Sequence, residues 1–153
     1  MDLYKIKPKF MNLIDKLEPA RQIYEKAAER IHNDFMADPF RTMASKKRIY
    51  IKEIATLFDL DYEEHELEIR DKIKVEWEKI GIELNHLILQ WNENVLLQYR
   101  IHHEQEILEI YKDILEHGSY KDLFNTVIRN QLHESIKNLD ELQHLLEPYD
   151  FDH

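Results

Sequence analysis

Only two glycines and four prolines interrupt this chain of 153 residues, and this scarcity of turn-forming residues constrains the fold more than any other feature. A sheet protein needs a turn after every short strand, and glycine and proline supply many of those turns. Hydrophobic residues make up 43% of the chain, which is enough for one buried core at this length. The sequence therefore predicts one all-α domain spanning residues 1–153.

Apolar residues that recur at three- and four-residue steps predict where the helices lie. We expect helical segments at about 9–36, 39–58, 64–91, 92–117 and 120–147. Pro19 lies inside the first segment, where it either kinks the helix or breaks it. Asp38 and Pro39, in "ADPF", are expected to cap and begin the second segment. Gly118 and Ser119 are expected to separate the last two segments.

The simplest architecture for these segments is an antiparallel four-helix bundle. Short loops at "ADPF" and "HGSY" each join antiparallel neighbours. The segment around 64–91 is then an additional helix, either the long connection or an extended arm. The expected core covers about 9–147, and Pro148 begins a frayed tail at 148–153.

The chain is acidic, with a formal net charge of -10 and a pI near 5.3. Such a surface repels phosphate backbones and anionic lipids, so we expect neither nucleic-acid nor membrane binding. The one basic run, Lys46-Lys47-Arg48, is interpreted as a solvated helix face. The chain has no cysteine, no apolar stretch of roughly 18 residues and no signal-peptide core at its start, so a cytoplasmic protein is expected.

The pattern Glu-x-x-His occurs three times, at residues 29–32, 83–86 and 141–144. Ferritin-like proteins use this spacing to hold two iron ions inside a bundle. A helix turns about 100° per residue, and on that geometry every pair has at least one member pointing away from its apolar face. We therefore interpret all three pairs as surface residues.

A different carboxylate lies near the centre of an apolar face, namely Glu104 on the fourth segment. Burial of an ionised carboxylate is costly unless it is paired or hydrogen-bonded. Arg100, one turn earlier, is the nearest candidate partner. The last segment carries an inward polar seam of Gln131, Ser135 and Asn138. We predict a buried cluster of Glu104 and Gln131, completed by Tyr24, Tyr50 or Tyr111. The alternative is that Glu104 extends to an end of the bundle beside Arg100.

The stretches "LIDKLEPARQIYEKAAERI" and "PFRTMASKKRIYIKEI" resemble the start of a bacterial ferritin-like four-helix-bundle domain of unknown function. The matching positions there are Leu13, Ile14, Tyr24, Ala27, Ala28, Glu29 and Glu53. Later matches extend the resemblance over roughly 10–147, at Trp77, Glu104, Tyr111, Leu115 and Gln131. This resemblance implies a fold and little chemistry. Ile23 and His103 replace family glycines, and a histidine common on the family's last helix falls at Leu139, which removes a potential metal ligand.

Two functions remain open from the sequence. The first is a non-enzymatic binding or assembly module without a cofactor, because a di-iron site needs four carboxylates and two histidines and only Glu104 points firmly inward. A nucleophilic hydrolase is disfavoured, because the chain has no Gly-x-Ser-x-Gly elbow and no phosphate-binding glycine loop. The alternative is a di-iron carboxylate protein for iron storage or oxygen chemistry. Its ligands would be Glu104, Glu53, Glu25, and Glu134 or His133.

A second apolar stripe lies on the third predicted segment, opposite its core face. Its members are spaced by seven residues: Val75, Ile82 and Leu89. A helix that is apolar on two sides is covered by another chain or enclosed by its own fold. We predict a homodimer through this stripe.

Overall fold

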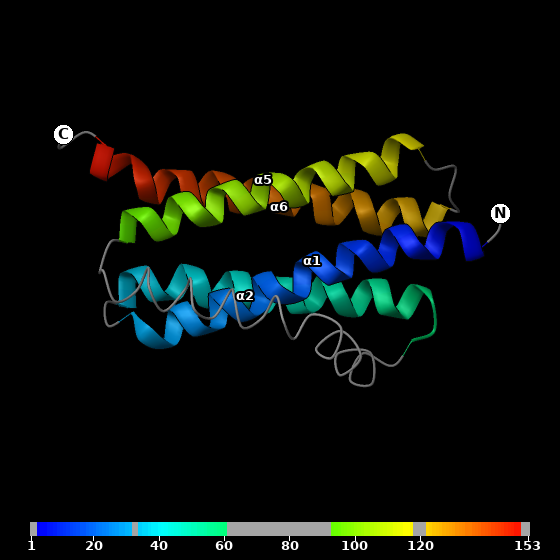
Figure 1. The fold of residues 1–153 in the computed structure, drawn as a ribbon, viewed down its shortest axis with the longest axis horizontal. Helices are drawn as coiled ribbons and strands as arrows, with labels where there is room; N and C mark the ends of the chain where they lie inside the picture. The colour runs from blue at the N-terminus through cyan, green and yellow to red at the C-terminus, as the bar shows by residue number, and fades with distance from the viewer. Residues whose placement is uncertain (1–2, 32–33, 61–92, 118–121, 151–153) are drawn as a thin grey trace.

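The computed structural model describes residues 3–31, 34–60, 93–117 and 122–150 (Figure 1). These residues form α-helices and no strand, as the all-α prediction requires. The helices are α1 (Leu3–Arg30), α2 (Asp34–Leu57), α5 (Glu93–His117) and α6 (Asp122–Asp150). The predicted segment 64–91, with its stripe of Val75, Ile82 and Leu89, lies outside the described residues.

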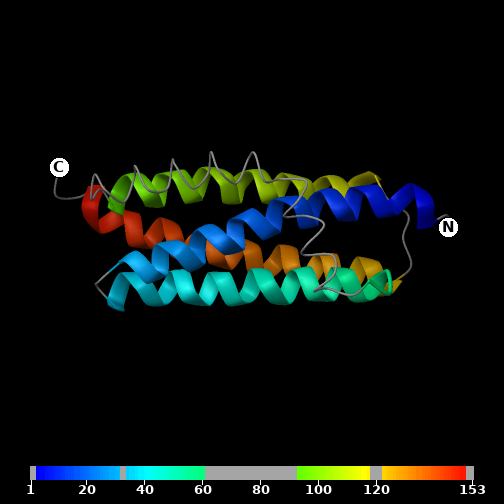
Figure 2. The ribbon, with the colours of Figure 1, turned by 60° about the horizontal axis from the view of Figure 1, so that its bottom comes forward.

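The four described helices lie side by side along one long axis (Figures 1 and 2). α1 and α2 run in opposite directions, and so do α5 and α6. α2 and α5 run in the same direction, so α2 ends at the opposite end of the bundle from where α5 begins.

Each helix packs against two antiparallel neighbours around a common core. The closest packing is within the pairs α1–α2 and α5–α6, while α1–α5 and α2–α6 pack less closely. Aromatic rings join helices at one end of the core: the Phe58 ring centroid lies 5.3 Å from that of Phe10 and 5.6 Å from that of Phe124. Burial of these apolar side chains supplies most of the driving force for the fold.

The structure corrects several predicted boundaries. α1 begins at Leu3 rather than near residue 9, and it continues through Pro19 without a break. α1 ends at Arg30 and α2 begins at Asp34, so "ADPF" lies inside α2 and does not separate the two helices. Pro39 is the sixth residue of α2, beyond the terminal N–H groups that lack a partner within the helix, so it removes one helical hydrogen bond without ending the helix. α6 passes Pro148 and ends at Asp150, so the tail begins later than predicted.

No described helix combines the length and the apolar character that crossing a membrane requires. The predicted turn residues Gly118 and Ser119 lie outside the described residues.

Candidate functional site

Glu104 lies at the centre of the bundle and receives hydrogen bonds from three helices. Its side chain is 1% exposed. The Tyr24 hydroxyl on α1 donates to Oε1 at 2.6 Å, and Lys47 Nζ on α2 donates to Oε2 at 2.8 Å. Arg100 Nη2, one turn earlier on α5, donates to Oε1 at 3.3 Å. Both carboxylate oxygens are thus occupied by donors of the same chain.

Arg100 is also buried, with 2% of its side chain exposed. Its guanidinium carbon lies 4.6 Å from the centroid of the Tyr24 ring. An arginine over an aromatic face gains a cation–π attraction, which strengthens when water is excluded. Tyr24 therefore supports both charged partners, with its ring against Arg100 and its hydroxyl on Glu104.

These charged side chains form the ionic cluster of Lys47, Arg100 and Glu104. It contains two cations and one carboxylate, which leaves one positive charge in excess among side chains that are 1–2% exposed. Removing each charge from water costs several kcal/mol, and mutual pairing must offset that cost. Glu104 is the only carboxylate that the described structure pairs with either cation, so the cluster depends on it.

The pKa values in the cluster follow this arrangement. Burial alone would raise the pKa of Glu104, but the charges of Lys47 and Arg100 outweigh burial and hold that pKa below its ordinary value. Burial raises the pKa of the Tyr24 hydroxyl well above its ordinary value. Glu104 is therefore ionised and Tyr24 is a neutral donor at pH 7.

A second group of hydrogen bonds centres on Gln131 of α6. The Tyr111 hydroxyl donates to Gln131 Oε1 at 2.8 Å. Gln131 Nε2 lies 3.1 Å from the Tyr50 carbonyl oxygen and 3.3 Å from Glu53 Oε1, and it donates to both. This Gln131 group links α5, α6 and α2 in the core.

The Tyr50 hydroxyl extends the polar contacts between α2 and α6. It donates to Glu134 Oε2 at 2.7 Å, and Asn138 Nδ2 lies 3.5 Å from the Tyr50 oxygen. Burial, followed by the contact with Glu134, raises the pKa of Tyr50 far above its ordinary value. Tyr50 is thus a neutral donor whose partner carboxylate lies at the protein surface.

The predicted cluster residues are all buried, but they form two groups rather than one. Tyr24 and Arg100 contact Glu104, whereas Tyr111 and the Tyr50 backbone contact Gln131. No hydrogen bond joins Glu104 to Gln131 among the described residues. The alternative in which Glu104 reaches out to a bundle end is not what the structure shows, because its carboxylate is buried against side chains of three helices.

Lys47 is the important residue that the sequence analysis missed. We interpreted Lys46-Lys47-Arg48 as a solvated face, which is wrong for Lys47, whose side chain is 1% exposed. The signal was its spacing: Lys47 lies four residues after Met43 and three before Tyr50, both buried on the core face of α2. The ion pair of Glu18 and Arg21, both buried on α1, was not predicted from the sequence either.

The residues of the di-iron alternative do not come together as a ligand set. Glu25 pairs with Arg21 at 2.6 Å, while Glu53 and Glu134 accept hydrogen bonds from Gln131 and Tyr50. His133 is exposed. Within the described ranges, no group of three or more His, Asp or Glu side chains is arranged to hold a metal ion. Two cations beside Glu104 also oppose a divalent ion there, so these residues do not fit a di-iron centre.

The Glu-x-x-His pairs lie at the surface wherever the structure describes them. Glu29, Glu141 and His144 are exposed, and His32 and the pair at 83–86 lie outside the described residues. On α5, His102 and His103 both contact the exposed Glu106, at 3.2 and 3.3 Å.

Comparison of the chain with protein-family models, with curated proteins and with solved structures finds no match. The residues of the ionic cluster and of the Gln131 group are therefore the basis on which a function can be argued.

The variant Glu104→Leu should destabilise the fold by about 3–5 kcal/mol, because it leaves Lys47 and Arg100 buried without a counter-charge. Combining it with Lys47→Met and Arg100→Met should recover most of that loss, since no charge then stays buried. Urea unfolding followed by circular dichroism measures both changes. The exposed Glu106→Leu on the same helix is the control and should change stability by less than about 0.5 kcal/mol. A neutral or stabilising single Glu104→Leu substitution would contradict this account of the cluster.

The lowered pKa of Glu104 also predicts a pH dependence of stability. A carboxyl whose pKa is lower in the folded state stabilises the fold fully above its ordinary pKa of 4.5 and loses that contribution as the pH falls below it. Urea midpoints measured from pH 6 downward should therefore fall more steeply for the wild type than for Glu104→Gln. Glu106→Gln is the control and should retain the wild-type slope. Identical slopes for wild type and Glu104→Gln would show that Glu104 has no lowered pKa.

Proposed function

We propose that this chain is a non-enzymatic ferritin-like helical bundle that acts as a binding or assembly module. The ferritin-like assignment is supported by the helix directions, since a bundle with one long connection between two parallel helices is the arrangement of ferritin-like folds (Figure 1). The resemblance of residues 10–147 to a ferritin-like domain also supports this assignment.

One observation carries the non-enzymatic part of the proposal. The carboxylate at the centre of the bundle, Glu104, is bound by Lys47, Arg100 and Tyr24 and has no oxygen free of these donors. In a di-iron bundle, carboxylates at the centre bind metal. Here the same kind of position holds an ion pair of the protein itself, which stabilises the bundle and leaves its surface as the place for function.

We expect iron loading of the purified protein to leave far less than one iron per chain, because the cations beside Glu104 repel a second positive charge. Incubation with Fe(II), desalting and elemental analysis measure the iron content. The matched variant is Glu104→Ala. It should bind as much iron as the wild type or more, because Glu104 is not an iron ligand in this proposal. About two irons per chain that are lost in Glu104→Ala would overturn the proposal in favour of the di-iron alternative.

The homodimer through Val75, Ile82 and Leu89 remains a proposal that rests on the sequence alone. Light scattering tests it: the mass of the wild type should be twice that of a variant with serine at these three positions. A monomeric mass for the wild type at high concentration would rule it out.

A further inference from the structure

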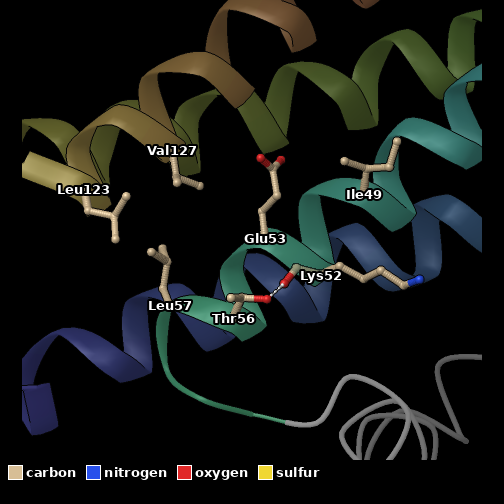
Figure 3. Close-up of a pocket in the computed structure, with 7 residues that line it drawn as sticks. All are labelled: Ile49, Lys52, Glu53, Thr56, Leu57, Leu123 and Val127. Atoms are coloured by element: carbon tan, nitrogen blue, oxygen red, sulfur yellow. Dashed lines mark hydrogen bonds between the residues drawn. The ribbon is translucent and has the colours of Figure 1, made fainter.

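An apolar groove runs along the surface between α2 and α6 (Figure 3). It has a volume of about 370 Å³. Its aliphatic lining is Ile49 and Leu57 from α2 and Leu123 and Val127 from α6. Leu123 is 65% exposed and Ile49 is 54% exposed, so the groove presents large apolar side chains to water. A partner that covers this groove would remove these apolar side chains from water, which favours binding.

A carboxylate stands within this groove. Glu53 projects from α2 toward the space between Ile49 and Val127 (Figure 3). Gln131 donates to Glu53 Oε1 at 3.3 Å, and Gln131 is itself held by Tyr111 and by the Tyr50 carbonyl oxygen. The buried Gln131 group thus reaches the surface at Glu53 and orients its carboxylate. Lys52 lies on the rim, with its side chain directed away from Leu57 and Val127.

A second acidic residue continues the same side of α6. Glu134 lies seven residues beyond Val127, which is two helical turns, or about 10 Å in total, along α6. It therefore lies on the same face of the helix as Val127. The Tyr50 hydroxyl donates to its Oε2 at 2.7 Å, which also orients a surface carboxylate. The seam between α2 and α6 therefore combines an aliphatic groove with two acidic side chains held by buried donors.

We propose that this groove binds an amphipathic helix of a partner protein, with aliphatic residues on one face and lysine or arginine beside them. A groove between two helices accepts the apolar face of a third helix through residues at i, i+3, i+4 and i+7. Glu53 and Glu134 select a basic partner over an acidic one, and the net charge of -10 attracts it from a distance. The inference rests on the proposed function as a binding module and names the class of its partner.

The test uses the full chain and a synthetic helical peptide of 18 residues with leucines on one face and lysines beside them. A second peptide of the same length carries glutamates in place of the lysines. Fluorescence anisotropy should detect binding of the basic peptide and at least tenfold weaker binding of the acidic one. Leu123→Ser should weaken binding of the basic peptide at least tenfold, whereas Ile136→Ser, which removes an exposed isoleucine of α6 outside the groove, should leave it unchanged.

Charge selection is tested at Glu53. Glu53→Gln should weaken binding of the lysine peptide three- to tenfold, and the exposed Glu109→Gln on α5, which makes the same change in net charge, should have no such effect.

Equal effects of Leu123→Ser and Ile136→Ser, or of the two glutamine variants, would overturn the proposal. So would a lack of peptide binding, or a dimer of this chain that Leu123→Ser dissociates, since the occupant would then be a second copy. These outcomes are independent of iron content, so failure here is distinguishable from failure of the non-enzymatic proposal.

Discussion

The pairing of Glu104 with Lys47 and Arg100 is the interaction on which the rest of this bundle depends. Apolar burial drives the helices together, but it does not tolerate two uncompensated cations in the centre. Because Glu104 takes its partners from α1, α2 and α5, the ionic cluster is complete only when these three helices are in register. Polar groups that must find specific partners can fix one arrangement among many apolar ones, and we regard this as the role of the cluster.

The cluster supplies from protein side chains the pairing that a charged group in the centre of a helical bundle needs. Di-iron bundles place polar side chains on facing helices and satisfy them with metal ions. In this chain lysine, arginine and tyrosine side chains take the place of a metal ion as the partners of the central carboxylate, Glu104. A lysine on the core face of α2 therefore has a structural use, because its charge pairs with Glu104 inside the protein.

The core and the surface groove are physically connected. Gln131 is fixed from inside by Tyr111 and by the Tyr50 backbone, and its remaining bond holds Glu53 in the groove. A surface carboxylate that is oriented before binding loses less conformational freedom when a partner arrives. α2 and α6 approach each other less closely than α1 and α2 or α5 and α6 do, and the groove at their surface holds apolar side chains beside that carboxylate.

The sequence by itself determined the helical class, the ends of α5 and α6 to within a few residues, and the position of Glu104, Tyr24, Tyr111 and Gln131 on the apolar faces of their helices. These follow from local spacing, since each residue's direction on a helix depends only on its position in that helix. Only the tertiary structure decided which of the buried side chains contact each other. Lys47 and Glu104 are 57 residues apart, and their contact depends on how α2 and α5 are placed around the core. The separation of the polar residues into two groups, and the groove in which Glu53 stands, follow from helix packing for the same reason. Periodicity indicates which face of a helix is buried, but packing decides which partner lies opposite it.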